Sequence, residues 1–319
     1  MAAYKEIKGI NVQNVSSDPT ELVGQMWYNS STTALKAYLE TTEGWSTIPS
    51  LNTPRSNLNV GGAGDSTAGL ATGGWPSGEA VKTEEFNGST WSAEEDMSNG
   101  SYRRATFGTQ TAAVCASGGN PLQGTTEEYD GSSWGSGGTS PVVRGITAGA
   151  GTLTAGLQTG GNNPSNITSQ VAEYDGSSWT SATSMPGGMY KHSSLGTQTA
   201  AGMGGCAPHP MTLPSASFVE YDGTNWTSGG NLPGNASYNK GASGTQTAGL
   251  YAMETSPSDY HTLKYNGSSW SEGPTTPANV GNTGVSSNTA GGNNTFLVGG
   301  STALSFDTGG VKTKTITIS

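Results

Sequence analysis

Three histidines, His192, His209 and His261, are the side chains best suited to acid–base chemistry, because the ordinary pKa of histidine lies close to neutrality. A serine hydrolase would hold one of them between a serine nucleophile and an orienting carboxylate. No Gly-x-Ser-x-Gly turn in this sequence follows a strand and opens a helix, which is the usual way to expose such a serine. We therefore predict a protein that is not an enzyme and assign no catalytic residue.

Carboxylates recur in the dipeptides Asp130-Gly131, Asp175-Gly176 and Asp222-Gly223, where they could bind a metal or shape a turn. Calcium takes about six to eight oxygen ligands, and one aspartate per turn cannot provide them. An aspartate before a glycine commonly accepts hydrogen bonds from the backbone that follows it. We expect turns at these positions, and neither a metal nor a cofactor.

The two cysteines, Cys115 and Cys206, lie 91 positions apart. An unpaired cysteine packs as a small apolar residue. We expect two buried free thiols, with a disulfide between them as the alternative.

The charge balance limits the partners of the protein. Its 319 residues include 13 Lys and Arg against 23 Asp and Glu, which gives a formal net charge of −10. A general nucleic-acid binder needs a basic stripe, and the longest basic run here is Arg103-Arg104. No run of about 18 apolar residues is present, so no membrane insertion is expected. The first ten residues lack the basic and apolar regions of a signal peptide.

Two motifs alternate along the chain. Tyr-Asp-Gly-Ser-Ser-Trp and its variants occupy residues 86–91, 129–134, 174–179, 221–226 and 265–270, with tryptophans 43 to 47 residues apart. Gly-Thr-Gln-Thr-Ala, followed by small apolar residues and Gly-Gly, occupies residues 108–119, 151–161 and 196–205, with degenerate copies at 64–74, 244–254 and 287–300. A repeat of this length indicates one structural unit per copy.

Each unit translates into four strands. An alternating segment leads to the Gly-Thr-Gln turn, and a short apolar strand then ends at Gly-Gly. A second alternating strand ends at Asp-Gly or Asn-Gly, a strong hairpin signal, and the tryptophan opens an outer strand. Four strands in 40 to 50 residues are typical of a β-propeller blade, so we predict an all-β propeller.

The strand ending in Gly-Gly, followed by a tyrosine and, five residues later, a tryptophan, resembles the kelch repeat. The Gly-Thr-Gln-Thr-Ala version is similar to the kelch-like repeats of phage structural and tail proteins. The resemblance covers residues 55–319 and departs from the pattern in the fifth unit, where Met253-Glu254 replaces Gly-Gly, and in the last, where no tryptophan follows Phe306-Asp307. The Asp-Gly turns do not match the aspartate box of sialidases, in which glycine and tryptophan stand one residue further on. Such propellers include enzymes, scaffolds and adhesins, so the fold does not imply a function.

We predict two domains, an N-terminal segment 1–54 and a kelch-like propeller 55–319. Six units favour six blades, and seven are the alternative. The N-terminal segment, with Trp27 and Trp45, is similar to short attachment modules of phage tail-fibre proteins. It could instead form an extra blade or lend a strand that closes the ring.

The loops between the second and third strands vary among units, and recognition commonly lies in varied loops on a rigid scaffold. The inter-blade segments on the same face place tyrosines six residues, and basic side chains four residues, before each Gly-Thr-Gln. We predict a ring of aromatic and basic groups that binds a saccharide or an anionic ligand. The predicted ligand-binding residues are Tyr102, Arg104, Arg144, Tyr190, His192, His209, Met211, Tyr238, Lys240 and Tyr260. Alternatively, each tyrosine packs between blades and each base caps a backbone carbonyl.

The resemblance, together with these loops, favours a non-enzymatic phage virion protein, associated with a tail or fibre, that binds a glycan or protein on the host surface. Its partners would be other virion proteins and a host receptor, and an oligomer is compatible with this role. One alternative is a capsid decoration or tail-assembly protein that contacts other virion subunits. Another is a glycan-processing enzyme or a copper oxidase, because a propeller brings distant loops together.

Overall fold

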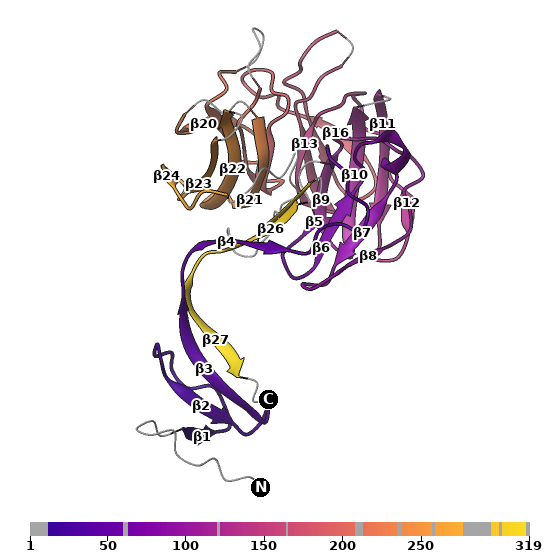
Figure 1. The fold of residues 1–319 in the computed structure, drawn as a ribbon. Helices are drawn as coiled ribbons and strands as arrows, with labels where there is room; N and C mark the ends of the chain where they lie inside the picture. The colour runs from indigo at the N-terminus through magenta and orange to yellow at the C-terminus, as the bar shows by residue number, and fades with distance from the viewer. Residues whose placement is uncertain are drawn as a thin grey trace. The chain divides into compact units, whose positions relative to one another are not determined.

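The computed structural model describes residues 12–59, 63–119, 122–163, 165–207, 213–234, 238–256, 259–276, 295–299 and 302–316. Almost all regular structure in these ranges is β-strand, with one short 3-10 helix at Ser77–Glu79. The chain divides into two compact units, one formed by Met1–Gly44 with Thr308–Ser319 and the other by Trp45–Asp307 (Figure 1). No helix in the described part is long and apolar enough to cross a bilayer.

Five sheets of the larger unit contain four antiparallel strands each, arranged side by side in chain order. Their strands are β5 (Ala63–Gly64), β6 (Gly69–Thr72), β7 (Thr83–Phe86) and β8 (Trp91–Ala93); β9 (Ala105–Thr109), β10 (Ala112–Gly119), β11 (Leu122–Tyr129) and β12 (Trp134–Ser136); β13 (Ala148–Thr152), β14 (Ala155–Thr159), β15 (Val171–Tyr174) and β16 (Trp179–Ala182); β17 (Ser193–Thr197), β18 (Ala200–Gly204), β19 (Ser217–Tyr221) and β20 (Trp226–Asn231); and β21 (Tyr238–Thr245), β22 (Ala248–Ser256), β23 (Asp259–Tyr265) and β24 (Trp270–Glu272). The fifth unit forms its four strands although it lacks Gly-Gly. The four strands predicted for each of these repeats are therefore confirmed.

The sixth sheet contains β25 (Phe296–Gly299), β26 (Thr302–Asp307) and β4 (Gly44–Ile48), in that order. β4 lies beside β26, where the fourth strand of a blade belongs. The ring centroid of Trp45 in β4 lies 4.9 Å from that of Phe306 in β26, which repeats the Tyr–Trp contact of the other blades. The strand that the last repeat lacks is therefore supplied from the N-terminal part of the chain.

Apolar clusters connect the sixth blade to both of its neighbours. Val298 and Ala303 pack with Phe86 and Trp91 of the first blade. Leu297 and Leu304 pack with Ala252 of the fifth blade and with Trp45. The six sheets therefore form a closed ring, and the described residues of the larger unit make a β-propeller of six blades. The predicted all-β propeller is confirmed, and the core lies between neighbouring blades.

The glutamine of the Gly-Thr-Gln motif joins the second, fourth and fifth blades to the blade before each of them. The side-chain amide of Gln198 donates to the carbonyl oxygens of Gly156 and Tyr174 in the preceding blade, at 3.0 and 3.1 Å. Gln110 and Gln246 make the same pair of bonds. The glycine of the motif is required, because a Cβ on Gly196 would lie 2.1 Å from the carbonyl oxygen of Ala200.

The Asp-Gly-Ser-Ser motif forms the predicted turns. Oδ1 of Asp175 accepts hydrogen bonds from the backbone N–H groups of Ser177 and Ser178, at 2.8 and 2.7 Å. The equivalent bonds of Asp130 lower the pKa of its carboxyl to about 2. The aspartates therefore shape turns, as expected.

The smaller unit is one sheet of four strands, β1 (Gln13–Val15), β2 (Met26–Asn29), β3 (Ala34–Thr41) and β27 (Gly310–Ile316), in the order β1-β2-β3-β27. β27 pairs antiparallel with β3 along its whole length, and the two strands run side by side in Figure 1. Trp27 is fully buried against Tyr38, with ring centroids 4.4 Å apart. Both ends of the chain thus build this unit, and the units divide at Gly44 and Asp307 rather than at residue 54.

Candidate binding site

Two kinds of segment share one side of the propeller. The segments between the second and third strands of a blade meet the segments that join successive blades through backbone hydrogen bonds. Gly118 donates to the carbonyl of Arg144 at 3.1 Å, and Gly161 donates to that of Met189 at 2.7 Å. We call this side the loop face, and its described residues include 55–58, 73–82, 94–104, 137–147, 160–163, 165–170, 183–192, 205–207 and 213–216.

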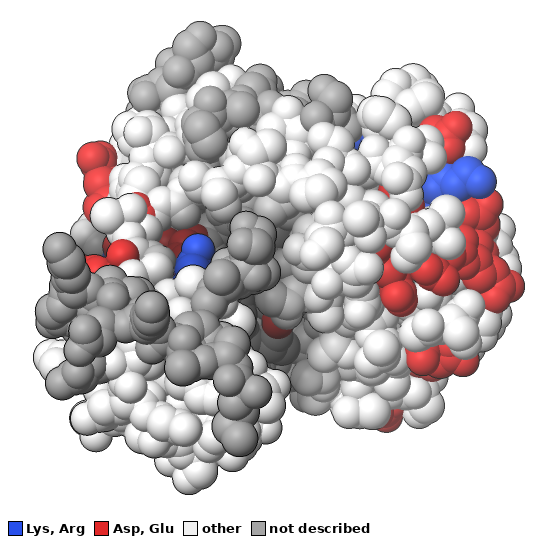
Figure 2. Space-filling view, turned by 60° about the horizontal axis from the view of Figure 1, so that its bottom comes forward, with Lys and Arg blue, Asp and Glu red and all other residues white. Residues whose placement is uncertain are grey.

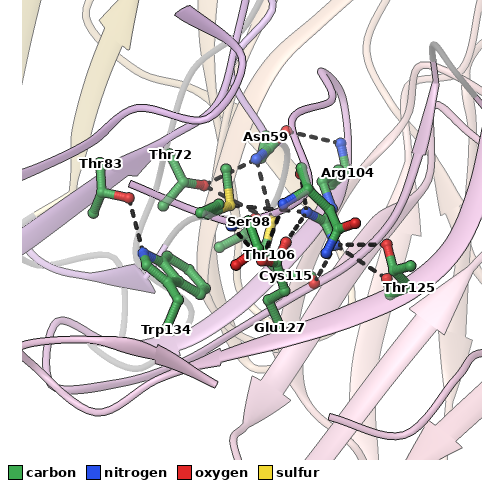
Figure 3. A network of polar contacts seen from close by, with 12 residues as sticks. Asn59, Thr72, Thr83, Ser98, Arg104, Thr106, Cys115, Thr125, Glu127 and Trp134 are labelled. Atoms are coloured by element: carbon green, nitrogen blue, oxygen red, sulfur yellow. Dashed lines mark hydrogen bonds and ion pairs between the residues drawn. The ribbon is translucent and has the colours of Figure 1, made fainter. Parts of the chain in front are cut away.

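Arg104, which we predicted to bind a ligand, is fully buried beneath the loop face (Figure 3). Its Nη1 lies 2.7 Å from Oε2 of Glu127, and its Nη2 donates to the carbonyl oxygens of Cys115 and Thr125 at 2.9 and 3.0 Å. Its own N–H donates to Oδ1 of Asn59 at 3.0 Å. Arg104 is therefore a structural cation inside the second blade.

Arg144 and His192 are also buried. Arg144 donates to the carbonyl oxygens of Gln170 and Gln158, at 2.6 and 3.2 Å, and burial lowers its pKa to about 10. Nε2 of His192 lies 2.9 Å from Oγ1 of Thr159. Burial and the nearby charge of Arg144 lower the pKa of His192 to about 3, so this imidazole is neutral at physiological pH.

The prediction that Arg104, Arg144 and His192 bind a ligand is therefore corrected. The two arginines cap backbone carbonyls inside their blades, as the alternative proposed, and Arg55 does the same in the first blade, where it pairs with Glu84. A loop that turns inward leaves carbonyl groups without strand partners, and a long cation can satisfy several of them at once. Arg104 and His192, four positions before their Gly-Thr-Gln turns, are therefore part of the core.

The basic groups nearer to solvent stand one residue earlier, at Arg103 and Lys191. Both have left-handed backbone angles, with φ values of 55° and 54°, and so do Asn57 and Ile146 at the corresponding places in the first and third blades. Arg103 donates its N–H to the carbonyl of Asn57 at 3.3 Å, and Ile146 donates to the carbonyl of Arg103 at 3.1 Å. We call Asn57, Arg103, Ile146 and Lys191 the entry ring, because they precede the innermost strands of four successive blades.

A residue with a left-handed backbone lies just before the first strand of these blades. It shifts the alternation of inward and outward side chains by one position from the one we predicted. The signal was therefore present in the sequence as the pairs Arg103-Arg104 and Lys191-His192. One member of each pair enters the blade and the other stays partly exposed. The backbone conformation decides which member of each pair is nearer to solvent.

Aromatic side chains surround the same region. The indole of Trp75 is 47% exposed and contacts the ring of Tyr102 edge to face, with centroids 6.0 Å apart. Sequence reasoning predicted Tyr102 but missed Trp75, which directly follows Gly73-Gly74 in the first of the variable loops. Nζ of Lys191 lies 5.6 Å from the ring centroid of Tyr190. Partly buried rings with an accessible face offer stacking surfaces for ligands.

The remaining predicted residues have other positions. Tyr260 is partly buried in β23. Tyr238 and Lys240 belong to β21, but their side chains lie outside the described part of the chain. His209 and Met211 lie entirely outside it. They stay predictions.

Cysteines and possible metal ligands in the described ranges could also take part in chemistry. Cys115 and Cys206 are free and buried, as expected. No group of three His, Cys, Asp or Glu side chains among the described residues could hold a metal ion. Acidic groups gather at the right side of the face shown in Figure 2. Nζ of Lys82 pairs with Asp96 at 2.9 Å.

The protein is thus an all-β propeller, with six blades in its described residues, and a second, smaller β-sheet unit. No protein-family profile matches the chain, and no curated protein is significantly similar to it. A solved structure described as "Structure of YjhT" is similar in fold, with a TM-score of 0.60 and 13% sequence identity, and the match covers 84% of this chain and 100% of the other. At this identity the likeness concerns the fold alone.

Proposed function

We propose that this protein is a non-enzymatic binding module of a phage particle, in which the loop face of the propeller recognises a saccharide or protein on a host surface. The observation that carries the binding role is the Trp75–Tyr102 pair on the loop face. Trp75 is 47% exposed, and few other large apolar side chains are exposed in the described ranges. The two rings come from neighbouring segments of the first and second blades and form one platform.

The absence of an enzymatic role is part of the proposal. His192 is neutral, buried and bonded to Thr159, so it has neither the exposure nor the pKa of a general base. Nδ1 of His261 lies 4.0 Å from Oε1 of Glu272 at the outer strand of its blade. These two histidines belong to different blades and to different networks of contacts.

A role in a phage particle rests on the kelch-like and tail-fibre-like resemblance of the sequence and agrees with the two-unit construction. The smaller unit exposes Leu22 and Val23, which are 65% and 49% exposed, and these apolar groups suit attachment to another subunit. In this proposal the smaller unit attaches the protein to the particle, and the propeller binds the host surface.

Two variants separate binding from attachment. Trp75→Ala should abolish binding of the full chain to an array of bacterial surface glycans, while Val143→Ala, which removes a 51% exposed apolar group from the same face, should not. The double variant Leu22→Ser and Val23→Ser should bind normally but fail to join particles, as seen with a labelled antibody. If the Trp75 change instead blocks incorporation into particles, the protein is a structural virion component.

A further inference from the structure

We propose that Ser117 and Gln123 of the second blade form a hydrogen-bonding subsite for the hydroxymethyl group of a neutral hexose whose ring lies on the aromatic platform. That platform is the Trp75–Tyr102 pair. The inference rests on the proposed function, because it names the class of saccharide and the side chains that select it.

The backbone of Ser117 is strained. Nine residues after the first glycine of each Gly-Thr-Gln motif, or of its degenerate copy, the first four blades have Gly73, Ser117, Gly160 and Gly205. All four residues are left-handed, with φ values of 60°, 60°, 56° and 69°. Glycine adopts this conformation freely, whereas a side chain makes it unfavourable. The second blade thus keeps a serine at a position that suits glycine.

The hydroxyl of Ser117 adds a second cost. The residue is fully buried, and its Oγ has no hydrogen-bond partner among the described residues. Removing a hydroxyl from water without giving it a hydrogen bond is unfavourable. Strained backbones concentrate at functional sites, and a buried unsatisfied group calls for a reason of its own. A hydroxyl that bonds to a ligand provides that reason.

The side chain of Gln123 carries a second unsatisfied group in the same hairpin. Gln123 of β11 pairs with Gly118 of β10, the residue that follows Ser117. Its Nε2 is buried and has no acceptor in the described part of the chain, while the residue as a whole is half-buried. Because no hydrogen bond of Nε2 holds the amide, the side chain can turn toward a ligand without breaking one.

Contacts through Ser101 connect this hairpin to the platform. A Cβ on Gly118 would lie 2.4 Å from Oγ of Ser101 and 3.1 Å from Nε2 of Gln123, so both groups surround the same point. Ser101 directly precedes Tyr102 in the chain. A Cβ on Gly73, in the loop of the first blade, would lie 2.7 Å from the carbonyl oxygen of Ser101. The segment that carries Tyr102 therefore lies between that loop and the hairpin.

A neutral hexose fits both parts of this site. Its C–H face would contact the aromatic rings, and its hydroxymethyl arm rotates and extends beyond the ring edge. The oxygen of that arm would accept a hydrogen bond from the amide of Gln123, and its proton would be shared with Ser117. The charges buried in this blade already pair with each other, with Arg104 2.7 Å from Glu127. The site therefore requires no charge on the ligand.

The test measures binding of matched sugars to the full chain. The probes are the methyl glycosides of glucose, galactose and mannose, each compared with its 6-deoxy form, which lacks only the primary hydroxyl. At least one hexoside should bind about tenfold more tightly than its 6-deoxy form, as expected for a hydrogen bond that the analogue leaves unmade. Gln123→Ala should reduce this preference to about twofold or less and leave the affinity for the 6-deoxy sugar unchanged. Gln13→Ala, which changes an exposed glutamine of the smaller unit, is the matched control and should alter neither.

Ser117→Gly separates a binding role from a structural one. Glycine suits the left-handed backbone and removes the unsatisfied hydroxyl, so the midpoint of thermal unfolding should rise by about 2 °C. The same variant should lose most of the preference for the hexoside. A lower midpoint with an unchanged preference would show that the serine serves the fold, and it would overturn the inference.

Three results with the sugars would also overturn the inference. These are equal affinities for every hexoside and its 6-deoxy form, an unchanged preference in Gln123→Ala, and no binding by any of these sugars. Binding to the glycan array that depends on Trp75 would still leave the proposed function standing.

Discussion

The indole nitrogen of Trp45 donates a hydrogen bond to Oγ1 of Thr262, which lies 217 residues later in the chain, at 2.7 Å. Trp134 makes the same bond to Thr83 at 2.9 Å, and Trp179 makes it to Thr126 at 2.8 Å. In each case the tryptophan opens the outer strand of one blade and the threonine lies in the third strand of the blade before it. Trp45 is thus the missing tryptophan of the sixth repeat, and the ring is closed by strands from distant parts of the chain.

Removing this closure should weaken the whole ring. Trp45→Ala should lower the free energy of unfolding by about 2 kcal/mol, because it removes contacts with Phe306 and Leu304 and leaves Thr262 without this bond. Urea unfolding measures the loss. Trp75→Ala is the matched control on an exposed tryptophan and should cost about 0.5 kcal/mol or less. Equal losses for the two variants would show that β4 does not support the propeller.

The two buried arginines should respond differently to truncation. Arg104→Met strands the buried carboxylate of Glu127 and should cost about 3 kcal/mol. Arg144→Met strands no acidic group, because Ala172 stands at the position of Glu127 in the third blade, and it should cost about 1 kcal/mol. Chemical denaturation of both variants tests the difference. A larger loss for Arg144→Met would mean that its bonds to carbonyls outweigh the ion pair of Arg104.

His192 should make the protein sensitive to acid. The unfolded chain binds a proton at this histidine below its ordinary pKa near 6.5, whereas the folded protein keeps it neutral down to a pKa of about 3. Protonation therefore favours the unfolded state between these values, and stability should fall by up to about 1.4 kcal/mol per pH unit as the pH drops. His192→Gln should flatten this part of the profile, measured as unfolding midpoint against pH from 7 to 4. Parallel profiles for the unmodified protein and the His192→Gln variant would contradict the low pKa of His192. The control is His261→Gln, which changes a partly exposed histidine.

Hydrogen bonds between tyrosine and glutamate side chains of neighbouring blades should stabilise the propeller. The hydroxyl of Tyr221 donates to Oε1 of Glu173 in the preceding blade at 2.8 Å, and Tyr265 donates to Glu220 at 3.1 Å. Tyr221→Phe keeps the ring and should lower the free energy of unfolding by about 1 kcal/mol. Tyr102→Phe, on the loop face, should have no effect on thermal stability. No difference between these variants would mean that water replaces the lost bond.

The repeats made most of the fold predictable. Local signals such as Asp175-Gly176 and the Gly-Thr-Gln of residues 196–198 specify turns and glycine conformations within a few residues. Their period then implies the propeller. The sixth blade was harder to predict, because Trp45 precedes its first regular copy and its partner Phe306 lies near the other end of the chain. Pairing between such distant strands depends on ring closure and not on local pattern.

The loop face could be predicted from the sequence, whereas the orientation of the basic side chains before each inner strand could not. Arg104 and His192 were predicted to bind a ligand and are buried. Arg103 directly precedes Arg104, and Lys191 directly precedes His192. A single left-handed residue in each segment reverses which of the two neighbours faces outward. Sequence patterns assume regular alternation, and such a residue breaks it.

The amino-acid sequence by itself determined the strands, the turns, the repeat and therefore the propeller, because each depends on interactions between residues close in the chain or repeated at a constant period. Only the tertiary structure decided that β4 completes the sixth blade and that β27 joins β3, since these pairings connect the two ends of the chain. It also decided which basic residues became core and which formed the entry ring. That choice follows from the backbone geometry at the start of each inner strand and from the carbonyl groups that needed a cation.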